Sequence, residues 1–324
     1  MKQEKNGRRP AVSVVVVTWD NLGTLKQCLE HLAAASWHSR LDTEVIVVDN
    51  GSTDGTSEYL AERPETVHYR FEHNVGFGPA SNKGIGLARA PLVVLLNDDI
   101  IVDPGFLEPM VRHFSRPEVF AVAPFMVLNG EPLRGRSVGR FQKGFMGIEI
   151  VNDHPGRPAN VLFAGGGAGM FRREMLINLG CFDKLYHPFY FEDVDLGYRA
   201  WKRGWVCISE PGSKVHHLHA GTIGKRFSKR QVYAIARRNH ILFHWKNIHD
   251  GEWMADHIWH LAKESFWAGI SFKLTEVLAV IMALERIAPA IKARNTEKRQ
   301  VLAGDRDVLE AVNFNHISAL HVRP

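Results

Sequence analysis

The sequence predicts an α/β fold with a mainly parallel central sheet, flanking helices and a helical C-terminal region. Residues 92–96 are five consecutive aliphatic residues, as in a strand buried on both faces of a parallel sheet, and they lead directly into Asn97, Asp98 and Asp99. Apolar runs alternate with helical patterns through residue 116. The last third of the chain shows helical periodicity alone.

The first strand is predicted at residues 11–17, and a helix with Asn21 as its capping residue follows it. Its apolar face is formed by leucines at helical spacing: Leu22, Leu25, Leu29 and Leu32. Residues 44–48 and 67–71 predict the next two strands, each followed by a polar or glycine-rich loop and a helix. These units together predict a β-α-β-α-β-α-β arrangement.

Right-handed crossovers place the loops that follow parallel strands on one edge of the sheet. Thr18, Asp49, Asn74, Asp98 and Asp99 each follow or end a predicted strand, so we expect them to converge. Ligands of open α/β sheets bind at this edge, and a Mg²⁺ or Mn²⁺ ion held by one or two carboxylates also binds phosphate oxygens. The sequence therefore favours a cation and phosphate site over the alternative, a solvated acidic turn.

The second half is predicted to be less regular. A strand is expected at 120–124, and residues 130–158 are rich in Gly, Arg and Pro, as in a mobile insertion. The glycine-rich stretch 165–169 lacks the spacing of a dinucleotide-binding loop, so its glycines are expected to allow a close backbone approach or a strand kink. A strand at 205–208 and a helix at 228–245 follow.

Three acidic residues, Glu192, Asp193 and Asp195, begin a predicted helix, where the helix dipole alone would favour them. In the last third, apolar residues recur at steps of three and four, at Trp267, Ile270, Leu274, Val277, Ile281, Leu284, Ala288 and Ile291. We expect this stripe to pack on the main domain, with shallow membrane contact as the alternative. Its fully apolar part is too short to cross a bilayer.

The composition is that of a globular enzyme, with a net charge of +5 and a polar N-terminus through Pro10 that lacks an apolar signal region. Basic residues gather near the ends: Lys2, Lys5, Arg8, Arg9, Lys292, Arg294, Lys298 and Arg299. This pattern fits an anionic membrane surface or simple solubility and argues against a nucleic-acid partner. The three cysteines lack metal-ligand spacing, which favours a reducing cytosol.

Several motifs recur in a fixed order between Val12 and about Asn247. They are Val-Val-Thr-Trp at 16–19, Val-Asp-Asn-Gly-Ser-Thr-Asp at 48–54, Asn-Val-Gly-Phe-Gly at 74–78, Asn-Asp-Asp at 97–99, Gly-Gly-Ala-Gly-Met at 166–170, Phe-Glu-Asp-Val-Asp-Leu at 191–196 and Arg-Asn at 238–239. With these motifs the chain resembles the inverting glycosyltransferases of family 2, most closely the bacterial rhamnosyltransferase-like members. The resemblance implies a GT-A-type, Rossmann-like fold.

The resemblance also implies roles for individual residues. Asp49 would accept a hydrogen bond from the pyrimidine base, Thr18 and Asn74 would lie at the nucleotide, and Asp98 would bind the ribose. Asn97 stands where the family has the first acid of its D-x-D motif, so Asp99 would be the metal ligand. The remaining implied roles are the catalytic base at Asp193, a second metal ligand at His217 with His216 as a rival, and donor or acceptor contacts at Trp19, Gly167, Glu192 and Arg238.

The implied organisation is a polar tail (1–10), a nucleotide-sugar-binding half (11–116), an acceptor-binding and catalytic half (117–250) and a helical extension (251–324). The implied reaction uses Mn²⁺ or Mg²⁺ to move a sugar, best matched by L-rhamnose from dTDP-L-rhamnose, to a saccharide or lipid-linked saccharide in cell-surface glycan synthesis. UDP-sugars are the second choice of donor. The implied location is the cytoplasm, with peripheral contact at the inner membrane face.

Two other classes of protein would share part of this pattern. A sugar nucleotidyltransferase would carry a glycine-rich, arginine-containing loop after its first strand, where this chain has residues 18–21, Thr-Trp-Asp-Asn. A non-catalytic nucleotide-sugar-binding protein would not need both Asp99 and Asp193, so the presence of both argues against that class.

Overall fold

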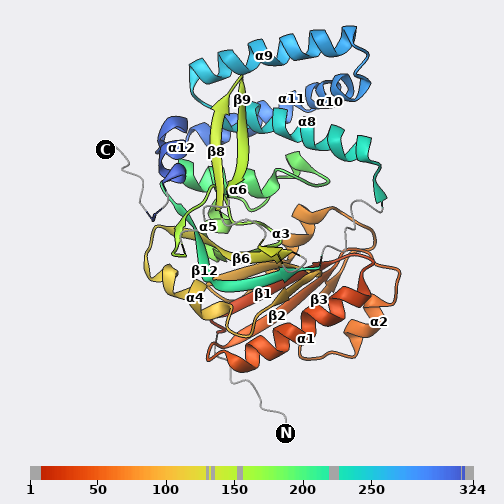
Figure 1. The fold of residues 1–324 in the computed structure, drawn as a ribbon. Coiled ribbons are helices and arrows are strands. Elements are labelled where there is room, and N and C mark those ends of the chain that lie inside the picture. Colours follow the sequence, from red (N-terminus) through yellow and green to blue (C-terminus); the bar gives the residue numbers. More distant parts are fainter. Residues whose placement is uncertain are drawn as a thin grey trace.

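The computed structural model describes residues 9–128, 131–132, 136–151, 156–218, 226–314 and 316–317. A mixed central sheet lies at the end of the molecule near the N-terminus, and helices gather at the opposite end (Figure 1). This arrangement confirms the predicted α/β class with a helical C-terminal region.

The first half alternates strand and helix as predicted. Its elements are β1 (Val12–Thr18), α1 (Leu22–His38), β2 (Thr43–Asp49), α2 (Thr56–Ala61), β3 (Val67–Arg70), α3 (Phe77–Leu87) and β4 (Leu92–Asn97). These strands are parallel, in the order β4-β1-β2-β3. The register pairs Thr18 with Asp49 and Val17 with Asn97, which brings the carboxyl ends of the strands to one level.

Asn21 occupies the predicted N-cap position of α1, but its side chain does not cap the helix. Its side chain makes no capping hydrogen bond to α1, and its Nδ2 instead donates to Oδ1 of Asp98 at 3.1 Å. The backbone N–H of Leu22 donates to the Asp54 carboxylate, at 2.8 Å, from the loop after β2. The Asp54 carboxylate, from a loop distant in sequence, therefore caps α1 in place of Asn21. The Asn21 side chain is left to bind Asp98.

The middle of the chain adds strands to the same sheet. These elements are β5 (Ile100–Val102), α4 (Leu107–Val111), the 3₁₀ helix η1 (Arg112–Ser115), β6 (Val119–Leu128), β7 (Glu131–Pro132), β8 (Arg136–Gln142), β9 (Phe145–Val151), β10 (Ala159–Asn160), β11 (Ala168–Arg172), α5 (Arg173–Asn178) and the 3₁₀ helix η2 (Lys184–Tyr186). Strand β11 runs antiparallel between β4 and β6.

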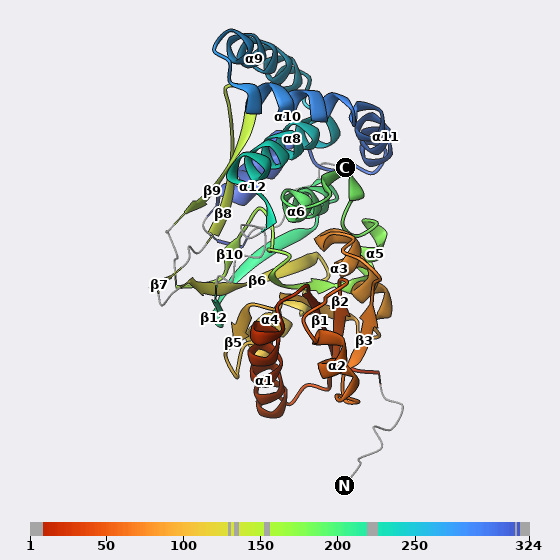
Figure 2. The same ribbon diagram turned by 90° about the vertical axis from the view of Figure 1, so that its right-hand side faces the viewer.

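Within residues 130–158, the expectation of an irregular insertion is wrong for the part that the structure describes. Strands β8 and β9 form an antiparallel hairpin that stands away from the central sheet and reaches the C-terminal helices (Figure 2). Glycines and charged residues concealed this hairpin in the sequence, because its strands are stabilised by contacts with α8 and α9 rather than by a continuous apolar run. The ring of Phe145, for example, packs on His244 and His257 of these two helices.

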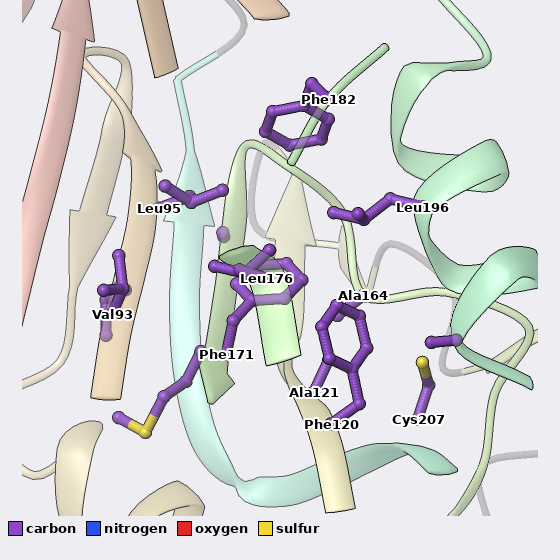
Figure 3. Close-up of a cluster of buried hydrophobic side chains, with 14 of the residues drawn as sticks. Val93, Leu95, Phe120, Ala121, Ala164, Phe171, Leu176, Phe182, Leu196 and Cys207 are labelled. Carbon is purple, nitrogen blue, oxygen red and sulfur yellow. The ribbon is translucent and has the colours of Figure 1, made fainter. Parts of the chain in front are cut away.

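The core lies on both faces of the sheet. Figure 3 shows side chains of β4, β6 and β11, among them Leu95, Phe120 and Phe171, packed with Leu176 and Leu196 from two helices. Each of these five side chains is at most 2% exposed. Their burial fixes β4, and through it the position of the acidic residues at its carboxyl end.

The remaining elements are α6 (Glu192–Lys202), β12 (Val206–His217), α8 (Lys229–Asn247), α9 (Gly251–Ile270), α10 (Leu274–Leu284), α11 (Ile287–Lys298) and α12 (Asp305–Asn313). The expectation that the C-terminal apolar stripe packs on the main domain is wrong. Trp267, Ile270 and Leu274 are 56%, 54% and 72% exposed, whereas the small side chains of Ala279 and Ala283 are buried. Among the described residues, no helix is long and apolar enough to span a membrane.

Candidate active site

Asp98 lies in the turn that follows β4 and is held by two side chains from the end of β1. The hydroxyl of Thr18 donates to its Oδ2 at 2.6 Å, and Asn21 donates to its Oδ1. Burial raises the pKa of Asp98 to about 6, against the effect of these two hydrogen bonds. The parallel sheet therefore brings Thr18 and Asp98 together, although 80 residues separate them.

Asp99 meets a histidine because β12 bends across the end of the sheet. The last residues of β12 pair with β5, in a register that places His217 opposite Ile100. The Nε2 atom of His217 lies 3.1 Å from Oδ2 of Asp99, whereas His216 contacts Asp103 at 3.0 Å. Of the two histidines that the sequence left open, His217 is thus the one adjacent to Asp99.

Asp49 ends β2 and is almost fully buried. Its carboxylate accepts hydrogen bonds from the backbone N–H of Ser52 at 2.8 Å and from the hydroxyl of Ser57 at 3.0 Å. Arg70 lies opposite Asp49 in the register of β2 and β3 and approaches the carboxylate to 3.9 Å. The sequence analysis did not identify Arg70. It could have been found by aligning the two predicted parallel strands, because their register pairs Arg70 with Asp49.

Asn74 lies at the carboxyl edge of the sheet, as predicted, where its side chain shapes the loop before α3. Its Oδ1 accepts from the backbone N–H of Gly76 at 2.8 Å and from Nδ2 of Asn50 at 3.2 Å. Asn50 in turn accepts from the N–H of Val75 at 2.9 Å. The two asparagines therefore join the loops that follow β2 and β3.

Trp19 lies next to Thr18 and is covered by a residue that the sequence analysis missed. The guanidinium of Arg226 stacks over the Trp19 ring at 4.5 Å from its centroid and also pairs with Asp20. Arg226 is separated from this loop by more than 200 residues, so local sequence offered no signal for the contact. A cation and an aromatic ring thus lie together beside the strand edge.

The glycine-rich loop lies between the two acidic groups of the site, which are Asp98 and Asp99 after β4 and Glu192 and Asp193 at the start of α6. The carbonyl of Gly167 accepts from the N–H of Asn97 at 2.9 Å, and a Cβ at Gly167 would lie 2.9 Å from the Asn97 side chain. A backbone hydrogen bond from Gly166 reaches the carboxylate of Asp193 and favours its ionised form. Close backbone approach, one of the two roles expected for these glycines, is therefore observed.

Glu192 and Asp193 begin α6 and differ in their electrostatic surroundings. Burial and the charge of Asp193 raise the pKa of Glu192 to about 8. Burial also raises the pKa of Asp193, but hydrogen bonds from the backbone N–H groups of Val194 and Gly166 oppose this. The Oε2 atom of Glu192 is buried, and no described residue forms a hydrogen bond with it. Glu192 therefore keeps its proton to a higher pH than an ordinary glutamate, while the two backbone donors favour the carboxylate form of Asp193.

The turn before α6 is held by a residue pair on α8. Asn239 donates to the carbonyls of Phe189 and Tyr190, at 2.9 Å each, and Tyr190 and Phe191 adopt left-handed backbone angles. Arg238 is buried, and its guanidinium donates to the carbonyl of His187. Arg238 and Asn239 therefore both support the backbone that precedes α6.

Asp195 belongs to a buried network. Burial alone would raise its pKa, but the adjacent Arg199 and Lys246 cations hold the pKa well below its usual range. Oδ2 lies 2.7 Å from Nε of Arg199, and Tyr186 and Asn247 donate to Oδ1 at 2.8 Å each. These contacts hold the start of α6 in place.

We expect Asp195→Asn to lower the free energy of unfolding by about 3–5 kcal/mol, because it leaves the buried Arg199 without its carboxylate and leaves Lys246 with Asp183 alone. Denaturant unfolding followed by circular dichroism measures the change. Glu62→Gln, at an exposed position after α2, is the matched control and should change stability by less than about 0.5 kcal/mol. A loss below about 1 kcal/mol for Asp195→Asn would contradict the network's stabilising role.

Comparison with known proteins identifies the family of the chain that carries this site. The sequence model of glycosyl transferase family 2 matches residues 13–180, which is more than half of the chain. The chain belongs to glycosyl transferase family 2. The match includes β1 to β4, Asp49, Asp98, Asp99 and the glycine-rich loop.

One curated relative is the N-acetylglucosaminyl-diphospho-decaprenol L-rhamnosyltransferase of Mycobacterium tuberculosis. It is 27% identical over 277 residues, which cover 76% of this chain and 88% of that protein. Among solved structures, GalNAc-T7 with UDP, GalNAc and Mn²⁺ matches 95% of this chain and 57% of its own, with a TM-score of 0.67 and 16% identity. A mannosyltransferase from Pyrobaculum calidifontis, in complex with GDP-Man and Mn²⁺, matches 90% of this chain and 81% of its own, with a TM-score of 0.53 and 18% identity. These likenesses show the GT-A fold.

Proposed function

We propose that this family 2 chain is a metal-dependent inverting glycosyltransferase, which moves a sugar from a nucleoside diphosphate to an acceptor hydroxyl. The observation that carries the proposal is the pair of acidic groups on the two sides of one glycine-rich loop. Gly167 contacts Asn97, which precedes Asp98 and Asp99, and Gly166 contacts Asp193. A donor diphosphate at the first acidic group and an acceptor at the second would then meet across this loop.

The residues at the end of β4 fit a divalent cation. Oδ2 of Asp99 and Nε2 of His217 lie 3.1 Å apart, and Oδ1 of Asp99 is buried without a hydrogen bond from any described residue. Two protein ligands suit Mn²⁺ or Mg²⁺, which complete their coordination with water and phosphate oxygens. Such an ion, when bound, would stabilise the negative charge that develops on the departing diphosphate. Within the described part of the chain, no cluster of three or more His, Cys, Asp or Glu ligands supplies an alternative.

Asp193 is the proposed catalytic base. An inverting displacement needs a base on the face of the sugar opposite the diphosphate, within about 2.6–3.2 Å of the acceptor hydroxyl. Asp193 belongs to a different segment from Asp99, and the N–H groups of Val194 and Gly166 favour its carboxylate form. Glu192, neutral at pH 7, retains a proton that it can donate in a hydrogen bond to the acceptor.

We expect kcat/KM to rise with pH as Asp193 loses its proton and to fall again near pH 8 as Glu192 ionises, because two adjacent carboxylates repel each other and the hydrogen-bond donor is lost. Glu192→Gln keeps a neutral donor and should remove only the alkaline limb. Rates measured from pH 5 to pH 10 for both proteins test this. An unchanged alkaline limb in the variant would assign that limb to another group.

The proposed donor carries a pyrimidine base. Asp49 is buried at the nucleotide end of the sheet, held by Ser52 and Ser57, and can accept from the N3–H of uracil or thymine. The relation to a rhamnosyltransferase favours dTDP-L-rhamnose, with UDP-sugars as the second choice. Calorimetry with dTDP, UDP and GDP in the presence of Mn²⁺ tests the base. Tightest binding of GDP would contradict the assignment.

The proposed acceptor is a saccharide or lipid-linked saccharide used in cell-surface glycan synthesis, since the rhamnosyltransferase relative is named for a diphospho-decaprenol acceptor. We assign the reaction to the cytoplasm, at or near the inner membrane face. The cysteines support a reducing compartment, because all three are free thiols in the structure.

A further inference from the structure

The outer surface of α9 and α10 exposes large apolar side chains where soluble proteins usually expose polar ones. We call this surface the C-terminal apolar face. Its members are 48–72% exposed: Trp259, Phe266, Ile270, Leu274, Leu278, Ile281 and Leu284. Helices α9 and α10 lie at the end of the molecule opposite α1 (Figures 1 and 2).

Both helices leave several large apolar side chains on the side that faces outward. On α9, Trp259, Phe266 and Ile270 are seven and four residues apart and share one side, while Leu261 and Ala268 are buried on the other. On α10 the buried residues are both alanines. A surface helix normally buries its large apolar residues, so this reversal indicates that the face is covered by another surface during function.

Several acidic side chains of the C-terminal helices are paired with arginines, two of which each serve two carboxylates. These ion pairs join Glu252 to Arg306, Glu264 and Glu276 to Arg237, and Glu297 to Arg203. In contrast, several exposed basic residues form no ion pair with any described residue: Lys263, Lys273, Lys292, Lys298 and Arg299. Glu285, at the end of α10, is likewise exposed and forms no ion pair with any described residue, so the unpaired charges near the face are mostly positive.

Two of these lysines line the same groove as an aromatic residue of the stripe. A groove of about 670 Å³ between α8, α9 and α10 is lined by Lys263, Lys273 and Trp267, and also by Lys143 at the tip of the β8–β9 hairpin. Ammonium groups beside an exposed indole are the arrangement that binds lipid phosphates at a membrane interface.

We propose that the C-terminal apolar face docks on the surface of a bilayer that contains anionic lipid. Trp259 and Phe266 enter the boundary between headgroups and acyl chains, and Lys263 and Lys273 contact lipid phosphates. A second copy of the chain fits this face less well, because a two-fold interface would bring the unpaired lysines of both copies together. The docking does not depend on the proposed transfer reaction.

The test is sedimentation of the full chain with phosphatidylcholine vesicles that contain phosphatidylglycerol, at low and high salt. We expect binding at low salt, weaker binding at high salt, and little binding to vesicles of phosphatidylcholine alone. The double variant Trp259→Ser, Phe266→Ser and the double variant Lys263→Glu, Lys273→Glu should each reduce the vesicle partition coefficient at least about tenfold.

Matched controls lie at the other end of the molecule. Trp37 on α1 is 93% exposed, and Lys26 and Arg40 are also exposed. Trp37→Ser and the double variant Lys26→Glu, Arg40→Glu should bind vesicles as the wild type does. Circular dichroism and nucleotide affinity show that each variant is folded.

Three results would overturn the proposal. The first is equal loss of vesicle binding in the α1 controls and the face variants, and the second is no binding of the wild type at low salt. The third is a wild-type dimer, measured by light scattering without lipid, that Trp259→Ser, Phe266→Ser converts to a monomer, since the face would then be a protein interface.

Discussion

Asp193→Asn should lower kcat about 10²–10⁴-fold while leaving donor affinity within about twofold, because the amide keeps the shape of the carboxylate and cannot accept the acceptor's proton. The position of Asp193 at the start of α6, beside Gly166, explains why a group remote from the metal ligands in sequence would control turnover. Single-turnover rates with saturating donor and Mn²⁺ measure the chemical step, and calorimetry measures donor affinity.

Glu192→Gln is the control for Asp193→Asn. It alters the adjacent acid, which is neutral at pH 7, and should retain most of the turnover at that pH. If Asp193→Asn kept more than half of the wild-type turnover, or if Glu192→Gln lost as much as Asp193→Asn, the base would not be Asp193.

Asp99→Asn and His217→Asn should each weaken Mn²⁺-dependent binding of nucleoside diphosphate at least about tenfold, because each removes one of two proposed protein ligands. Nucleotide binding without metal should change little. Calorimetric titration of the nucleotide with and without Mn²⁺ separates the two contributions.

The neighbouring histidine provides the matched control for this pair. His216 is 44% exposed at its side chain and contacts Asp103 rather than Asp99. His216→Asn should therefore bind the nucleotide with Mn²⁺ as the wild type does. A larger loss in His216→Asn than in His217→Asn would assign the second ligand to His216.

The sequence predicted the fold of the first half because each of its strands is a continuous apolar run and each crossover is a recognisable helix. The rule that crossovers are right-handed then predicted that Thr18 and Asp98 would meet, and they share a hydrogen bond of 2.6 Å. Arg70 was within reach of the same reasoning, because the register of β2 and β3 pairs it with Asp49.

Other features depend on tertiary contacts that local sequence does not encode. Asn21 has the residue type of a helix cap, yet it donates to Asp98 because Asp54 takes over the capping role. The β8–β9 hairpin relies on packing against α8 and α9, through contacts such as that of Phe145 with His257. The direction of the C-terminal stripe was also hidden, because helical periodicity identifies an apolar side without indicating whether it faces the core or the surface.

The central claim is that this chain transfers a sugar with inversion, and a donor screen tests it most directly. The purified protein is incubated with Mn²⁺, a lipid-linked saccharide fraction, and dTDP-, UDP- or GDP-sugars, and products are followed by mass spectrometry and by NMR of the anomeric centre. The account predicts release of nucleoside diphosphate from a pyrimidine donor and a glycosylated product of inverted configuration, both lost in Asp193→Asn. Intact nucleotide binding without turnover of any donor, or a product of retained configuration, would contradict it.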